Sequence, residues 1–167
     1  MKPTTKAGIV LGVLVVVWTF VMGVTGWYKD PSLLSLFYLV VLIEVGVLIW
    51  GLKMTAAEGR TYGGQIGAGT LIALIGAVII FAGSYFFTEI AYPQYFEEVR
   101  EVGRQQLLAT GMPPADVEAQ LDMAASMQTS FVSALMGAIM TIVTGVVASL
   151  IIALFYRKKP VPSAVEA

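Results

Sequence analysis

Long runs of apolar residues, separated by short polar segments, dominate the pattern of this chain. Four such runs cover about residues 7–28, 32–52, 64–88 and 129–156. A helix needs about 20 apolar residues to cross the hydrocarbon core of a bilayer, so each run is long enough to span it. The pattern predicts an all-α integral membrane protein, with residues 1–167 forming a single membrane domain whose four spans pack as a helix bundle.

The first run follows Lys2 and Lys6, which is also typical of a secretory signal peptide. The run is longer than the apolar core of a usual signal peptide, and no A-x-A cleavage site follows it. We therefore expect a first spanning helix that is retained in the protein, and four crossings that place both termini on the same side of the membrane.

The polar stretch at about residues 93–128 predicts a helical hairpin outside the membrane, between spans three and four. Tyr95, Val99 and Val102 recur at helical spacing opposite charged residues. Gly111 is a natural helix stop, and Pro114 can open a second helix, which we expect to continue into the fourth span. The apolar stripes of the two helices can pack on each other, lie on the membrane surface or bind a partner protein. We expect them to pack on each other.

Basic residues predict the orientation, because cytoplasmic loops of membrane proteins carry an excess of Lys and Arg. The side that holds both termini carries seven of the ten basic residues, namely Lys2, Lys6, Lys53, Arg60, Arg157, Lys158 and Lys159. The other side carries three and is rich in acidic residues. We expect a bacterial inner (cytoplasmic) membrane protein with both termini in the cytoplasm and residues 89–128 on the outer side.

Composition strengthens the membrane interpretation and removes several kinds of chemistry. Apolar residues make up 57% of the chain and charged residues 13%, against about 45–50% and 25% in soluble domains. Cysteine and histidine are absent, which excludes disulfides, Cys or His metal sites and Ser-His-Asp catalysis. We expect no catalytic residue, cofactor, metal site or nucleic-acid partner.

Small residues recur at helical spacing in three of the runs, where they let helices approach closely in lipid. The positions are Gly8 and Gly12 in the first run, Gly69, Gly76 and Gly83 in the third, and Gly137, Thr141, Gly145, Ser149 and Ala153 in the fourth, where they form one predicted face. We expect these residues to pack the four helices of one chain. The alternative is a homo-oligomer or a membrane-protein partner, docked most readily on the first span.

Glu44 stands near the middle of the second run, where an acid costs about 2.5–3.5 kcal/mol to insert. No Lys or Arg lies at that depth, so the neutral, protonated acid is favoured. By depth its hydrogen-bond partners are Thr19, Thr144 or Ser149, and such a bond would pin the second helix to the bundle. Two alternatives stay open: a proton or cation site, and contact with a basic residue of a partner.

Three features resemble a known bacterial membrane family. They are the tract FTEIAYPQY at residues 87–95, the break at Gly111, and the run GVVASLI at 145–151 that leads to the basic end at 157–159. With the order of the spans, these resemble the family called domain of unknown function 4199. The resemblance implies a small multi-pass membrane protein and no established activity. It covers nearly the whole chain, but Pro113 and Pro114 replace an expected Ser or Thr cap, and Glu44 matches no family motif.

These observations favour a non-enzymatic structural or accessory membrane protein that acts through helix–helix contacts, with the lipid bilayer as its environment. The alternative is a small transporter, or a component that conducts ions or protons by means of Glu44. A membrane enzyme is disfavoured, because the one cluster of charged side chains is explained more simply as the solvated face of the outer hairpin.

Overall fold

The structure is a computed structural model that describes residues 1–125 and 128–158. In this part, the chain forms α1 (Pro3–Thr25), η1 (Trp27–Lys29), η2 (Leu34–Tyr38), α2 (Leu39–Ala56), α3 (Tyr62–Phe86), η3 (Phe87–Ala91), α4 (Tyr95–Ala109), α5 (Pro114–Ala125) and α6 (Ser130–Tyr156). Helices long and apolar enough to cross a membrane cover Pro3–Thr25, Ser35–Ala56, Tyr62–Ala91 and Ser130–Tyr156. The predicted all-α fold with four spans is confirmed.

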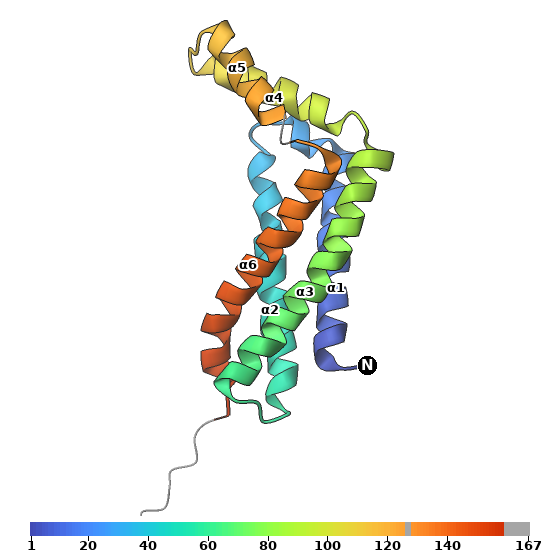
Figure 1. The fold of residues 1–167 in the computed structure, drawn as a ribbon, viewed down its shortest axis with the longest axis vertical. Helices are drawn as coiled ribbons and strands as arrows, with labels where there is room; N and C mark the ends of the chain where they lie inside the picture. The colour runs from blue at the N-terminus through green and yellow to red at the C-terminus, as the bar shows by residue number, and fades with distance from the viewer. Residues whose placement is uncertain (126–127, 159–167) are drawn as a thin grey trace, which may run out of the picture.

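The four spanning helices lie side by side in an elongated bundle (Figure 1). Helix α3 packs against both α1 and α6, and α2 packs against α1 and α6 on the other side. The start of α1 and the end of α6 lie at one end of the bundle, called the termini end below. Helices α4 and α5 lie at the opposite end, called the hairpin end.

Glycines allow α1 and α3 to pack with their backbones close together. A Cβ atom on Gly8 would lie 2.6 Å from Cβ of Ile75, and one on Gly12 would lie 2.5 Å from Cβ of Ile79. From the opposite helix, a Cβ on Gly76 would lie 2.7 Å from the side chain of Leu11. The Gly8-x-x-x-Gly12 face of the first span is therefore covered by α3 of the same chain.

Small residues also set the contact between α3 and α6. A Cβ atom on Gly69 would lie 1.9 Å from Oγ of Ser149, and one on Gly145 would lie 2.4 Å from Cβ of Ala73. Gly83, at the other end of α3, faces α1 instead, where its Cβ would lie 2.3 Å from Val16. Small residues thus bring α3 close to α6 near the middle and termini end of the bundle.

The predicted five-residue face of α6 does not pack as one surface. Gly145, Ser149 and Ala153 are buried, whereas Gly137 is exposed and has open space where a side chain would be. Thr141 is half-buried, and its hydroxyl donates to the carbonyl of Gly137 at 3.0 Å. At 3.6 residues per turn, a row of residues four apart rotates by about 40° per step, so one neighbouring helix cannot cover all of it. Toward the hairpin end the buried small residues are Ala134 and Ala138.

Helices α4 and α5 form the predicted hairpin, and their inner faces pack on each other. Val102 of α4 and Val117 and Leu121 of α5 are buried. Helix α4 ends at Ala109, and Gly111 follows in the left-handed conformation with φ of 83°, as expected of a glycine stop.

One expectation about the hairpin is wrong: its second helix does not continue into the fourth span. Gln128 and Thr129 lie outside any helix, and α6 begins at Ser130. The hydroxyl of Thr129 accepts a hydrogen bond from the backbone N–H of Val132 at 3.2 Å. Thr129 therefore caps a new helix, because its side chain satisfies one of the free N–H groups of the first turn.

Candidate functional site

Glu44 lies where three of the spanning helices meet. It is on α2, its side chain is 5% exposed, and a Cβ atom on Gly145 of α6 would lie 3.0 Å from its Oε1 atom. The same Cβ position is 2.4 Å from Cβ of Ala73 on α3. The carboxyl group thus lies beside the crossing of α3 and α6. It fits there because residue 145 is a glycine and has no side chain.

The predicted hydroxyl partners of Glu44 are bonded elsewhere. The hydroxyl of Thr19 donates to the carbonyl of Val15 at 3.0 Å, and that of Ser149 donates to the carbonyl of Gly145 at 2.6 Å. Within the described residues, no hydrogen bond joins Glu44 to Thr144 either, and its buried Oε1 atom has no hydrogen-bond partner. The proposed hydrogen-bonded pin between helices is therefore not formed.

No charged side chain faces Glu44 from the helices packed against it. Helix α3 (Tyr62–Phe86) and helix α6 (Ser130–Tyr156) contain no Asp, Glu, Lys or Arg. Helix α1 carries one charged residue, Lys6, which lies over the ring of Trp50 at 5.6 Å. The other charged residue of α2 is Lys53, in its last turn. Glu44 is thus a buried acid with neither a counter-charge nor a hydrogen-bond donor in the described part of the chain.

A buried polar cluster closes the bundle at its termini end. The side chains of Gln65 on α3 and Thr55 on α2 are fully buried, and the Thr55 hydroxyl donates to Oε1 of Gln65 at 2.6 Å. Nε2 of Gln65 donates to the carbonyl of Tyr156 at the end of α6, at 2.9 Å. The cluster ties α2, α3 and α6 together, and each of its side chains has a partner, so its role is structural.

At the hairpin end, one acid fastens α4 to the loop after α1. The Tyr28 hydroxyl donates to Glu98, and Nζ of Lys29 lies 2.7 Å from the other carboxylate oxygen of Glu98. The hydrogen bonds from Lys29 and then from Tyr28 hold the pKa of Glu98 below its usual range. Burial and then the bond to Glu98 raise the pKa of Tyr28. Tyr95 of α4 packs on Tyr28, with ring centroids 5.1 Å apart.

This contact gives the hairpin end a defined response to pH. Because the folded-state pKa of Glu98 is depressed, its stabilising contribution is present above the unfolded pKa of about 4.3 and is lost as pH falls through the folded value. We expect amide hydrogen exchange in α4 to accelerate as pH is lowered below about 4, after correction for intrinsic exchange rates. A Glu98→Gln variant should show faster exchange at neutral pH and no such acid transition. An identical transition in that variant would contradict the assignment to Glu98.

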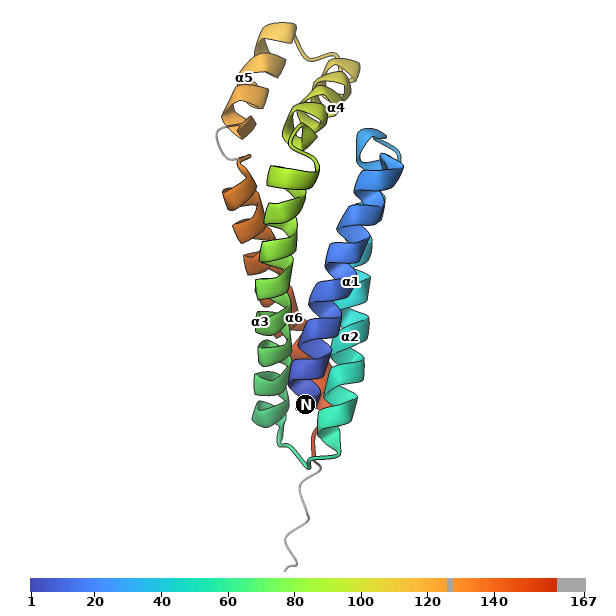
Figure 2. The ribbon, with the colours of Figure 1, turned by 90° about the vertical axis from the view of Figure 1, so that its right-hand side faces the viewer.

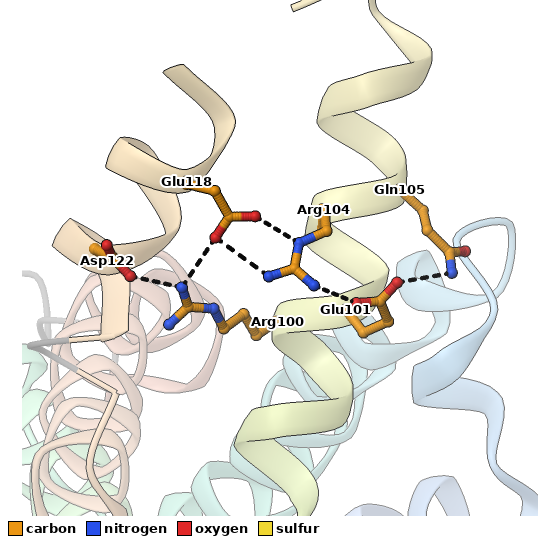
Figure 3. Close-up of polar contacts among 6 residues, drawn as sticks. All are labelled: Arg100, Glu101, Arg104, Gln105, Glu118 and Asp122. Carbon is orange, nitrogen blue, oxygen red and sulfur yellow. Dashed lines mark hydrogen bonds and ion pairs between the residues drawn. The ribbon is translucent and has the colours of Figure 1, made fainter. Parts of the chain in front are cut away.

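The two hairpin helices are also linked by ion pairs, shown in Figure 3. Arg100 on α4 lies 3.2 Å from Glu118 and 2.5 Å from Asp122, both on α5. Arg104 lies 2.7 Å from Glu118 and 2.7 Å from Glu101 on its own helix. Hydrogen bonds from Arg104 and then Arg100 lower the pKa of Glu118. These pairs are solvent-exposed, so their main effect is to fix the register of the hairpin.

A cavity of about 770 Å³ opens beside α4 at the hairpin end. Its lining includes Glu97, Glu98 and Glu101 of α4, together with Arg100 and Arg104. Both arginines are paired with carboxylates, so the uncompensated charge there is negative. In the described part of the chain, no three acidic side chains are grouped so that they could hold a metal ion.

The sequence pointed to Glu44, and the structure adds two polar groups that it did not single out. These groups are Gln65 and Thr55, which no pattern in the sequence marks as buried. Their partner at Tyr156 is a backbone carbonyl 91 positions away, which no local pattern reveals. Tyr28 and Glu98 are 70 positions apart and were likewise not linked. The signal that could have pointed to these contacts is the presence of polar residues at the ends of the apolar runs.

Comparison with known proteins identifies a family. The family model described as "Protein of unknown function (DUF4199)" matches residues 6–158. No match was found among curated proteins or among solved structures.

Proposed function

Because this chain belongs to the DUF4199 family, whose description gives no activity, we propose a function from its own residues: it is a non-enzymatic membrane protein whose Glu44 carboxyl takes up a proton or a small cation between α2, α3 and α6. The fold is that of a multi-span helical membrane protein. The proposal adds a role for Glu44, the one acid that is buried among the residues that the structure describes.

The observation that carries the proposal is the unpartnered carboxyl of Glu44. Its Oε1 atom is buried and accepts no hydrogen bond within the described residues. An unsatisfied buried polar group costs about 1–3 kcal/mol, and uptake of a proton or cation would account for its presence here. Intramembrane acids commonly mark the sites where protons or ions bind.

We further propose that the hairpin end lies outside the cell and that both termini are cytoplasmic, with the protein in the inner membrane and residues 89–128 on the outer side. Basic residues support this orientation. Six of the seven lie at the termini end, on the terminal segments of the chain or near the α2–α3 loop: Lys2, Lys6, Lys53, Arg60, Arg157 and Lys158. The seventh, Lys159, lies outside the described residues. An excess of Lys and Arg is typical of the cytoplasmic side.

Carbodiimide labelling tests the role of Glu44, because dicyclohexylcarbodiimide partitions into lipid and reacts with protonated carboxyl groups. We expect mass spectrometry of the protein in liposomes to find the adduct at Glu44, and to find none at that position in Glu44→Gln. Labelling that falls when Na⁺ or K⁺ is added would identify a metal cation as the ligand, whereas labelling that depends on pH alone would identify a proton. A wild-type protein unlabelled at Glu44 between pH 5 and 9 would contradict the proposal.

The same variant tests whether uptake extends to transport. If protons or cations cross the membrane by way of Glu44, their flux into reconstituted vesicles should be present in the wild type and lost in Glu44→Gln. Labelling at Glu44 without any flux would support a binding function and exclude transport under those conditions.

A second candidate function is that of a structural or accessory protein acting through helix–helix contacts, and an exposed pair of glycines favours it. Gly63 and Gly67 lie one turn apart on the outer surface of α3, with open space where their side chains would be. Such a pair permits close approach of another helix in lipid, and a second copy of this chain would supply one. Purification in a mild detergent should then yield a homo-oligomer, whereas a clean monomer would count against this function.

A further inference from the structure

We propose that the termini end of the bundle binds an anionic phospholipid, whose headgroup phosphate is held by Arg60, Arg157 and Lys158. The inference goes beyond the proposed role of Glu44 and does not depend on it. It rests on how the basic side chains at that end are distributed, paired and fixed in place.

Basic residues at the two ends of the bundle differ in their ion pairs. At the hairpin end, Lys29, Arg100 and Arg104 are each paired with at least one carboxylate. At the termini end, the described residues include six basic residues and one acid, Glu58. Among those six, Arg60 alone has an ion pair in the described part of the chain, with Glu58 at 2.7 Å. The termini end therefore carries positive charge that no carboxylate of the described residues neutralises.

Hydrogen bonds fix the end of α6 on both sides of Arg157. On one side, the carbonyl of Tyr156 accepts the bond from Nε2 of Gln65 at 2.9 Å. On the other side, the backbone N–H of Lys158 donates to the carbonyl of Arg60 at 2.9 Å. Figure 2 shows this junction at the foot of the bundle, where the end of α6 meets the α2–α3 loop. Arg60, Arg157 and Lys158 thus lie on two backbone segments that a hydrogen bond joins.

Tyrosines place this junction at the surface of the membrane. The guanidinium carbon of Arg157 lies 5.8 Å from the centre of the Tyr62 ring, which is a cation–π distance. The Tyr62 hydroxyl donates to the carbonyl of Leu150 on α6 at 2.9 Å, so the ring is held in position. Tyr62 and Tyr156 are end residues of two spans. Because tyrosines at span ends lie at the level of the lipid headgroups, the three cations lie at the depth of the lipid phosphates.

The chemistry of these side chains suits a phosphate group. Arginine presents a planar fork of N–H donors that can bind two phosphate oxygens, and lysine adds a compact positive charge. Arg60 uses its Nε atom for Glu58, while Arg157 and Lys158 are exposed and have no carboxylate partner among the described residues. Three like charges at one junction repel each other, and a bound anion removes that repulsion. Basic clusters at the ends of spans accordingly bind the headgroups of anionic lipids.

Exposed apolar side chains next to the cations favour a phospholipid over a free phosphate ion. On the last two turns of α6, Ile151, Leu154 and Phe155 are 60%, 50% and 79% exposed. They lie within the span, where lipid acyl chains cover them. A phospholipid contacts both the cations and this apolar surface, whereas a free phosphate ion contacts the cations alone.

Native mass spectrometry of the full chain in a non-ionic detergent tests the site. Phosphatidylglycerol is the anionic probe, and zwitterionic phosphatidylcholine is its control. We expect the wild type to bind phosphatidylglycerol more tightly. Each Lys or Arg beside an anionic headgroup contributes about fivefold in affinity, so Arg157→Gln/Lys158→Gln should weaken that binding about 25-fold. Both substitutions are at exposed side chains, and matching thermal unfolding curves establish that the variant is folded.

Lys2→Gln/Lys6→Gln is the matched control. It removes the same charge from the same end of the bundle, but on α1, which packs against α2 and α3. We expect this variant to bind phosphatidylglycerol about as tightly as the wild type does. Equal weakening in both double variants would overturn the site, because it would assign the binding to the total surface charge.

Two further results would also overturn the lipid site. One is equal affinity of the wild type for phosphatidylglycerol and phosphatidylcholine. The other is displacement of phosphatidylglycerol by millimolar inorganic phosphate, which would identify the ligand as a free anion. Glu44→Gln should bind phosphatidylglycerol as the wild type does, so the result is independent of the proposed function of Glu44.

Discussion

Replacing Gly69 with alanine should destabilise the bundle by about 1–3 kcal/mol, the usual cost of adding a methyl group to a tightly packed interior. A Cβ atom at this position would lie 1.9 Å from Oγ and 2.7 Å from Cβ of Ser149. The hydroxyl can rotate away, but the Cβ atom of Ser149 is fixed to its helix. Helices α3 and α6 must therefore separate, and thermal unfolding in detergent should begin at a lower temperature.

Two matched variants show whether the cost arises at this contact. Adding Ser149→Gly to Gly69→Ala restores the space, so the pair should recover most of the lost stability in a double-mutant cycle. Gly137→Ala, on the partner helix α6, meets no atom within 4 Å and should be neutral or slightly stabilising. Equal destabilisation by Gly137→Ala and Gly69→Ala would contradict an effect specific to the contact between Gly69 and Ser149.

The spans and the hairpin were predictable because each depends on local sequence. Apolar length defines a span, and Gly111 and Pro114 define the ends of the hairpin helices. The continuous helix into α6 was predicted wrongly because apolar residues precede Thr129 as well as follow it. In the structure, the capping hydroxyl of Thr129 decides where the helix starts.

The surroundings of Glu44 were harder to predict, because depth in the membrane says nothing about where a hydroxyl points. Thr19, Thr141 and Ser149 each donate to the carbonyl four residues earlier in their own helix. That bond is always available to Ser and Thr in a helix, and it competes with any bond between helices. The sequence could identify the buried acid, and only the three-dimensional arrangement shows that it is left without a partner.

Replacing Glu44 with leucine should therefore stabilise the ligand-free protein, by about 1–3 kcal/mol, because the substitution removes a buried polar group that has no hydrogen bond to lose. If Glu44 instead held the helices together by a hydrogen bond, the leucine variant would have a looser and less stable bundle. Glu44→Gln keeps a polar group of the same shape in the same place, so its stability should stay near that of the wild type. Thermal unfolding of the three proteins in one detergent, without added Na⁺ or K⁺, measures the order.

The space beside Gly145 is narrow, so a branched leucine could be strained there for reasons unrelated to polarity. Glu44→Met avoids this problem, because methionine is unbranched and can follow the path of the glutamate side chain. We expect Met to be at least as stabilising as Leu, and both variants to lose carbodiimide labelling at position 44. Gain of stability with loss of labelling is the pattern of a residue kept for function at a cost to the fold. If both apolar variants unfold at a lower temperature than Glu44→Gln, then Glu44 holds the helices together and the proposed site is wrong.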